Sequence, residues 1–203
     1  MRISTSPRLA AALVALALLP ASSSAQGLVA SPAAEARTGI HFSIGLGPGS
    51  ASASCPGCGA DFFEDRLTGV SGVAQLGFFA NPKLAVAAEF IGWLKNDAPI
   101  YRRVAGLGVS VLGYPSETSG FFVKGSVGGI RAIAEDDLLL IQTDAWMATT
   151  GIGYDLPVGE SISLTLYANY VRGFGGTTWV NGAASPVVVT PHALQVGAGF
   201  TVH

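Results

Sequence analysis

Hydrophobic and small or polar residues alternate with a period of two along much of this chain. The clearest case is residues 161–170, where Ile162, Leu164 and Leu166 alternate with serine and threonine. Side chains of a β-strand point alternately to its two faces, so this pattern predicts a strand with one apolar and one polar face. Residues 192–203 repeat the pattern at the end of the sequence.

Eight such stretches follow one another, and together they predict an all-β fold. The predicted strands cover about residues 39–47, 66–80, 84–94, 101–112, 121–130, 142–155, 161–170 and 192–203. The short connections are residues 81–83, 114–120 and 155–160, and the longer ones are 48–65, 95–99, 131–141 and 173–191. Alternating short and long connections with an even strand number are typical of a single eight-stranded, antiparallel, up-and-down transmembrane β-barrel.

The start of the sequence differs from the alternating region. Arg2 and Arg8 flank an apolar stretch at residues 9–19, and small residues follow up to Ala25. This composition predicts a signal peptide over residues 1–25, because the apolar stretch is too short to span a bilayer as a helix. Residues 26–38 are rich in alanine and serine and are predicted to form a flexible lead-in before the barrel domain, residues 39–203.

The composition favours a membrane over water. The chain is 49% hydrophobic and only 12% charged, yet no apolar run of 18 residues follows the signal peptide. Strands can cross lipid only as a closed barrel, which pairs every backbone amide and carbonyl. Without Arg2 and Arg8, nine basic residues remain against thirteen acidic ones. This acidic balance does not favour binding to nucleic acid.

The region from residue 39 to the end resembles the small eight-stranded outer-membrane barrels of the OmpA-transmembrane-domain and OmpX type. The segments SGFFVKGSVGG, GIGYDLPVGESISLTLYANY and ALQVGAGFTVH carry this resemblance. It implies a bacterial outer-membrane location, contact with membrane lipid and lipopolysaccharide, and insertion by the barrel-assembly machinery, which reads the final strand. Aromatic residues at the predicted strand ends suggest two girdles: Phe78, Tyr114, Phe121, Tyr154 and Phe200 at one rim, and Tyr101, Trp146, Tyr170 and Phe174 at the other.

Three charged residues fall in the predicted inward phase of consecutive strands. They are Glu89, Arg102 and Lys124. The interior of an eight-stranded barrel is filled by side chains, so unlike charges inside it should pair. We therefore expect Glu89 to pair with Lys124 or Arg102 and to close the lumen; a gated pore or a proton path is the alternative.

Two cysteines, Cys55 and Cys58, lie in a predicted loop of an exported chain. An oxidising compartment favours a disulfide between them. The alternatives are a redox motif, which lacks a visible device for lowering a thiol pKa, and a metal site completed by Asp61, Glu64 and Asp65. We expect no metal and no cofactor.

Histidine and serine residues raise the possibility of chemistry, because some eight-stranded outer-membrane barrels modify lipid A. His41 lies near Ser43 in the inward phase, and His192 opens the last strand, with Asp144 as a potential acid. No spacing pairs a nucleophile with its base, so no catalytic residue is predicted.

The longer connections could bind a surface partner or form a solvated rim. They carry Trp179, Phe62, Phe63 and the acidic trio Glu135, Asp136 and Asp137. The sequence thus predicts a non-enzymatic outer-membrane barrel with a filled lumen and a structural, adhesive or minor permeability role. The alternatives are a lipid A deacylase or acyltransferase, and a soluble periplasmic barrel whose apolar phase points inward around a ligand.

Overall fold

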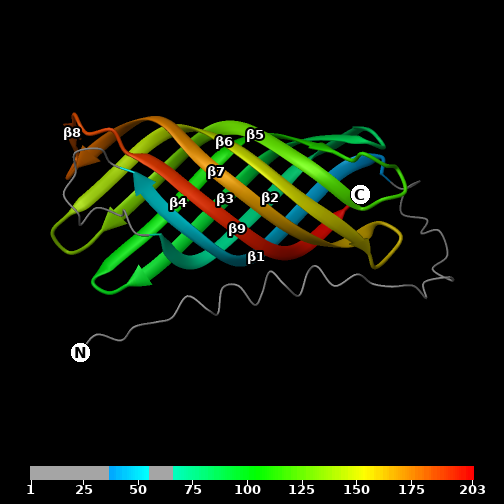
Figure 1. The fold of residues 1–203 in the computed structure, drawn as a ribbon, viewed down its shortest axis with the longest axis horizontal. Helices are drawn as coiled ribbons and strands as arrows, with labels where there is room; N and C mark the ends of the chain where they lie inside the picture. The colour runs from blue at the N-terminus through cyan, green and yellow to red at the C-terminus, as the bar shows by residue number, and fades with distance from the viewer. Residues whose placement is uncertain (1–36, 55–65) are drawn as a thin grey trace. The chain divides into compact units, whose positions relative to one another are not determined.

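A computed structural model describes residues 37–54 and 66–203, all within one compact unit that spans Ser31–His203. The strands are β1 Gly39–Ser54, β2 Leu67–Asn81, β3 Leu84–Asp97, β4 Ile100–Gly113, β5 Phe121–Glu135, β6 Leu140–Pro157, β7 Ile162–Val180, β8 Ala183–Ser185 and β9 Thr190–Val202. Figure 1 shows the long strands running obliquely to the barrel axis. No described residue belongs to a helix long and apolar enough to cross a membrane.

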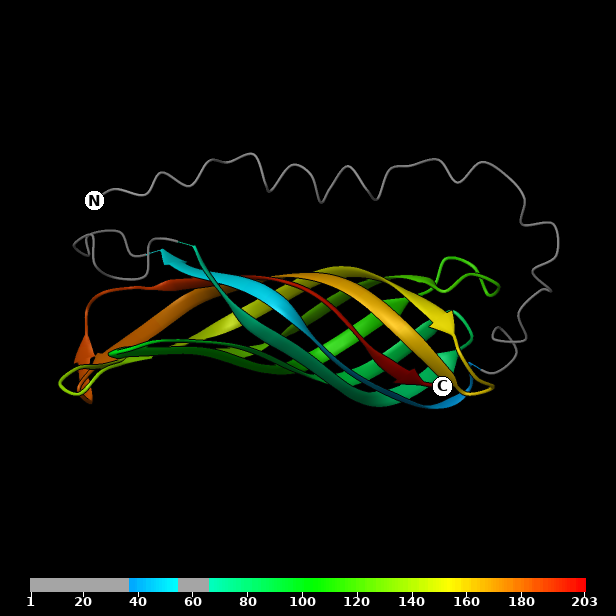
Figure 2. The same cartoon turned by 90° about the horizontal axis from the view of Figure 1, so that it is seen from below.

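Eight long strands close into one antiparallel barrel. Each of β1 to β7 pairs with the next strand in the sequence, and β9 closes the ring by pairing with both β7 and β1. The short strand β8 extends β7 beyond the ring as a small hairpin. This topology confirms the predicted fold class. The start of β1 and the C-terminus lie at one end, and β8 at the other (Figures 1 and 2).

The alternating pattern resolves into an apolar outer wall and a filled interior. On β5, Phe121, Val123 and Val127 point outward and are exposed, whereas Lys124 and Ser126 point inward and are buried. Many large hydrophobic side chains of the other strands are likewise exposed on the outer wall. A soluble ligand-binding barrel requires the opposite arrangement, so that alternative is wrong.

The strands extend further than the alternation predicts at the end with the longer connections. Residues 48–54, 131–135 and 173–180 belong to β1, β5 and β7, and residues 95–97 belong to β3. In residues 48–54 the outward positions are proline and serine and the inward positions are glycine and alanine, so no large apolar side chain marks either face and hydrophobic periodicity is lost. A tight turn at Asn181 and Gly182, both with positive φ, replaces part of the long loop expected at 173–191.

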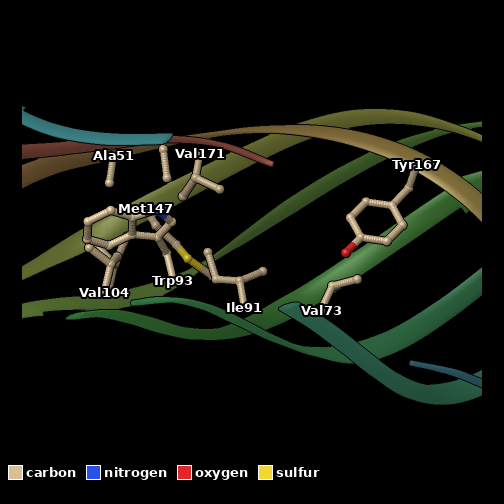
Figure 3. Packing of buried hydrophobic residues seen from close by; sticks show 10 residues of the cluster. Ala51, Val73, Ile91, Trp93, Val104, Met147, Tyr167 and Val171 are labelled. Atoms are coloured by element: carbon tan, nitrogen blue, oxygen red, sulfur yellow. The ribbon is translucent and has the colours of Figure 1, made fainter. Parts of the chain in front are cut away.

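Two apolar clusters inside the barrel are separated along its axis. The larger one, nearer the end with β8, consists of Ala51, Val73, Ile91, Trp93, Val104, Ile130, Met147, Tyr167, Val171 and Ala193. In Figure 3, Trp93, Met147, Val104 and Ile91 lie together across the interior. A Cβ atom at Gly106 would lie 2.7 Å from the sulfur of Met147, so this glycine makes room for the packing.

The smaller apolar cluster closes the end with the short turns. It consists of Phe79, Ala85, Leu112, Tyr114 and Phe122. Tyr114 was expected in an aromatic girdle, but it is buried and points into the barrel. The inward orientation is stabilised by the Tyr114 hydroxyl, because a buried tyrosine hydroxyl needs a hydrogen-bond partner and Asp155 accepts its hydrogen bond at 2.9 Å.

Candidate functional site

The centre of the barrel holds a buried ion pair within a hydrogen-bond network. The Lys124 Nζ atom lies 2.5 Å from Oε2 of Glu89, and both side chains are almost fully buried. Gln75 donates to Glu89 Oε2 at 2.7 Å, and Ser126 donates to Oε1 at 2.8 Å. The amide of Gln75 also contacts the Ser110 hydroxyl at 3.3 Å. Both carboxylate oxygens therefore have donors, which offsets the cost of burying the charge.

Of the three charged residues predicted to meet inside the barrel, Arg102 lies elsewhere. Its partner across the sheet is Lys95, whereas Glu89 lies opposite Gly108, six residues further along β4. Arg102 therefore shares the inward phase of Glu89 but not its height. Lys124 reaches Glu89 from two strands away because the strands are tilted, which places diagonal neighbours together in the interior.

A second polar cluster lies at the short-turn end, around the ring of Phe79. His41 and His203 pack against this ring, with centroid distances of 5.4 and 5.6 Å. Asp155 accepts hydrogen bonds from Tyr114 at 2.9 Å and from Thr165 at 2.6 Å. These residues come from widely separated parts of the sequence and meet only through barrel closure.

Arg37, which precedes β1, covers this cluster. Its guanidinium carbon lies 4.2 Å from the centre of the Tyr114 ring, and Nη2 donates to the Ser119 carbonyl at 2.9 Å. The residue is only 3% exposed. The lead-in was predicted to be flexible up to residue 38, and its described end is held in place by these contacts.

Several buried polar atoms of this short-turn cluster have no hydrogen-bond partner among the described residues. They are Nε and Nη1 of Arg37, Nδ1 of His41 and Nδ1 of His203. Burial, together with the positive charge of Arg37, lowers the pKa of His203 to about 4. Burial beside Asp155 raises the pKa of Tyr114. His203 is therefore neutral at pH 7 and Tyr114 keeps its proton.

The outer wall carries an ion pair at the upper end of its apolar face on β5 and β6. Outward-facing apolar side chains extend from the short-turn end up to Arg131 on β5 and Asp144 on β6, which face each other across the sheet. The pair is bidentate: Nε of Arg131 donates to Oδ1 at 2.5 Å and Nη2 donates to Oδ2 at 3.0 Å. Trp146, 74% exposed, lies next to this pair. An exposed apolar band ending in aromatic and charged residues is the arrangement of a membrane-spanning barrel.

Comparisons with solved structures find barrels of the same kind. The crystal structure of Neisserial surface protein A matches with a TM-score of 0.55 and 17% sequence identity, over 81% of this chain and 97% of that one. The outer membrane protein OprG from Pseudomonas aeruginosa matches with a TM-score of 0.50 and 14% identity, over 83% of this chain and 99% of that one. The chain has the fold of the small eight-stranded outer-membrane β-barrels. No protein-family model and no curated protein sequence matches it.

Within this outer-membrane barrel fold, the histidines considered for chemistry lie apart. His41 is buried in the interior at the short-turn end, 3.5 Å from Oε1 of Gln75, while Ser43 is bonded by Thr201. His192 lies on β9 in the outward phase, where Nδ1 is 3.1 Å from the Tyr170 hydroxyl. Asp144 is held by Arg131. The described residues therefore do not bring a serine, His192 and Asp144 together.

The predicted loop residues have different placements in the barrel. Glu135 ends β5, and Asp136 accepts backbone hydrogen bonds from Leu138 and Leu139, which fixes a tight turn. Trp179 belongs to β7 and pairs with Ala184 of β8. Cys55 and Cys58, together with Phe62 and Phe63, lie outside the described residues, so the predicted disulfide stays a prediction.

Sequence reasoning missed most partners of the two polar clusters. Gln75 and Ser126 lie in the inward phase of β2 and β5, and their residue types alone could have indicated contacts with Glu89. Asp155 is the last residue of the predicted strand 142–155 and the first of the predicted turn 155–160, and it continues the inward phase of β6, but its role as a hydrogen-bond acceptor was not predicted. No sequence pattern could have indicated the buried position of Arg37, because that position depends on how the chain enters the barrel before β1.

Proposed function

We propose that this chain is a bacterial outer-membrane protein with a closed lumen, and that its outer wall and loops carry a structural or adhesive role. Any permeability through the lumen is minor, and the protein is not an enzyme. Residues 1–25 direct export, and strand β9 is the segment read by the barrel-assembly machinery. Membrane lipid and lipopolysaccharide are the expected partners of the wall. No ligand is assigned to the loops.

The filled interior is the observation that carries this proposal. From the short-turn end, the interior holds the Phe79 cluster, then the Glu89 network, and then the cluster around Trp93. The two apolar clusters leave little room for a continuous file of water. Between them, the charges of Glu89 and Lys124 are paired with each other. Ions crossing such a lumen would lose hydration without gaining ligands.

Location is tested by heat-modifiability on a gel. Outer-membrane and periplasmic fractions are compared with and without boiling. We expect the protein in the outer-membrane fraction, with a mobility shift on boiling that reflects a detergent-resistant closed barrel. Recovery in the soluble periplasmic fraction without a shift would contradict the proposal.

Closure of the lumen is tested by conductance in planar bilayers. The native protein should show no steady ion current. Glu89→Gln removes one charge of the central pair, so it should raise conductance or lower the temperature at which the barrel unfolds. Glu117→Gln is the matched control, because Glu117 pairs with Lys83 at 3.4 Å on the exposed short-turn rim. If neither property of Glu89→Gln differs from the control, the central pair does not close the lumen.

A further inference from the structure

Four basic side chains of the outer wall lie at one height. Arg103, Arg131, Arg172 and His192 are each ten residues from the short-turn end of their strand, namely Gly113, Phe121, Ile162 and Val202. All four belong to the outward phase. Ten residues at about 3.3 Å, tilted by about 40°, correspond to roughly 25 Å, which is the height of the apolar band of an outer-membrane barrel. The four groups therefore mark the upper edge of that band.

Two of these groups form a denser basic cluster with a third residue. Arg172 on β7 lies opposite His192 on β9, and His192 lies opposite Ser52 on β1. Arg66 is exposed and precedes Leu67, which pairs with Ala51, so it continues the same row next to Ser52. The charges of Arg172 and Arg66 both act on His192. The row therefore runs from the Arg172 guanidinium through His192 and the Ser52 hydroxyl to the Arg66 guanidinium, with one guanidinium group at each end.

The two arginines of this basic row have no carboxylate partner among the described residues. Arg131 is engaged by Asp144, whereas Arg172 contacts the ring of Phe174 at 5.3 Å and forms no ion pair within residues 37–54 and 66–203. Arg66 forms none there either; Glu64 and Asp65 precede it in the sequence, outside the described residues. The guanidinium of Arg172 therefore keeps its donors for an anion.

Below the row, the wall is apolar. Tyr170 stacks on His192 with a ring distance of 6.4 Å, and Leu194 and Val196 are exposed beside it on β9. By the same count Arg66 is fifteen residues from Asn81, the short-turn end of β2, so it lies higher on the wall than Arg172, which is ten residues from Ile162. A ligand of this surface needs anionic groups at and above the height of Arg172 and hydrocarbon below them. That combination describes an anionic lipid of the outer leaflet.

We propose that Arg172 and Arg66, with His192 and Ser52 between them, bind the two phosphates of lipid A, the phosphorylated disaccharide anchor of lipopolysaccharide. Three strand spacings of about 4.8 Å separate the two arginines, roughly 14 Å in all. A head group with a phosphate at each end of a disaccharide can contact both guanidinium groups, whereas a glycerophospholipid with one phosphate contacts one. Arginine binds phosphate through paired, charge-assisted hydrogen bonds, and the acyl chains would lie along Tyr170, Leu194 and Val196.

This inference depends on the proposed outer-membrane location, and its test separates the two. The full chain is refolded into detergent micelles, and binding of diphosphorylated lipid A is compared with binding of phosphatidylglycerol. Arg172→Gln should weaken lipid A binding about tenfold, and the double variant with Arg66→Gln should weaken it further. Phosphatidylglycerol should bind more weakly than lipid A and lose less on the double substitution.

Arg103→Gln is the matched control, because Arg103 lies at the same height on β4, far from the basic row. The control should keep most of the lipid A affinity, and 0.5 M salt should weaken native binding. Equal affinity of the double variant and the native chain would overturn the inference, as would equal binding of the two lipids. A chain that shows no heat-dependent shift and stays in the periplasm would instead contradict the proposed function.

Discussion

The two polar clusters inside this barrel bury charge in different ways. At the centre, Glu89 receives donors from Lys124, Gln75 and Ser126. At the short-turn end, Arg37 donates only to the Ser119 carbonyl, and two of its nitrogens have no partner among the described residues. A buried charge that lacks partners is costly unless water or another group reaches it. The buried charge of the central cluster therefore has its own hydrogen-bond partners, whereas the short-turn cluster is the part of the interior more open to adjustment.

The sharpest way to test this difference is to remove one partner of the central pair. Lys124→Met leaves the Glu89 carboxylate buried without its counter-charge, so it should lower the free energy of unfolding by about 3–5 kcal/mol. Urea unfolding in detergent micelles, followed by tryptophan fluorescence, measures the change.

Two further variants show whether the loss comes from the uncompensated charge. The double variant Glu89→Gln with Lys124→Met should recover much of the stability, because no charge is then left buried. Lys83→Met removes an exposed ion pair with Glu117 and should cost at most about 1 kcal/mol. A double variant as unstable as Lys124→Met would show that the lysine stabilises the interior by packing rather than by charge.

The short-turn cluster should respond less to the loss of its cation. Arg37→Met removes the contact with the Tyr114 ring and the hydrogen bond to Ser119, which together are expected to contribute about 1–2 kcal/mol. Hydrogen exchange should become faster at the start of β5, near Ser119, and stay unchanged around Glu89.

Arg103→Met is the control for losing an arginine next to an aromatic ring. The Arg103 guanidinium lies 6.0 Å from the Tyr101 ring on the outer side of β4. Exchange near Ser119 should not change in this variant. If Arg37→Met also left that exchange unchanged, Arg37 would cover the short-turn end without stabilising it.

The sequence predicts the barrel well because lipid and a narrow interior impose opposite requirements on alternate residues. Residues 161–170 show this most clearly, and β7 contains nearly all of them. The upper strand end at residues 48–54 was missed because its side chains are small on both faces, serine and proline outward and glycine and alanine inward, so no large apolar residue distinguishes it from a loop. Strand pairing decides there, and pairing is set by neighbours that are distant in the sequence.

The candidate lumen residues show what alternation alone leaves out. The alternating pattern places Glu89, Lys124 and Arg102 on the inward side of their strands. Their heights along the barrel axis decide which of them meet. Counted from the short-turn end, Glu89 is five residues along β3 and Lys124 is three along β5, whereas Arg102 is eleven along β4. Counting residues from the predicted short turns would have shown that Arg102 lies too high in the barrel to meet Glu89. The short-turn cluster could not be predicted in this way, because Arg37 and His203 lie outside the strands.

The smallest expected effect is a pH dependence of the short-turn cluster. The pKa of His203 is about 4 in the folded barrel, below its usual 6.5, so the unfolded chain binds more protons between these values. Stability should therefore fall as the pH decreases from 6.5 to 4, with a slope for this one group of at most about 1.4 kcal/mol per pH unit. Unfolding in urea at stepped pH measures the slope.

The groups around His203 are Arg37, His41, Tyr114 and Asp155, and the Ser163 hydroxyl lies 3.1 Å from its Nε2. His203→Gln can keep that hydrogen bond and cannot bind the extra proton, so its stability should change less over the same range. An equal slope in His203→Gln would assign the dependence to other groups, and the short-turn cluster would then be no more adjustable than the centre.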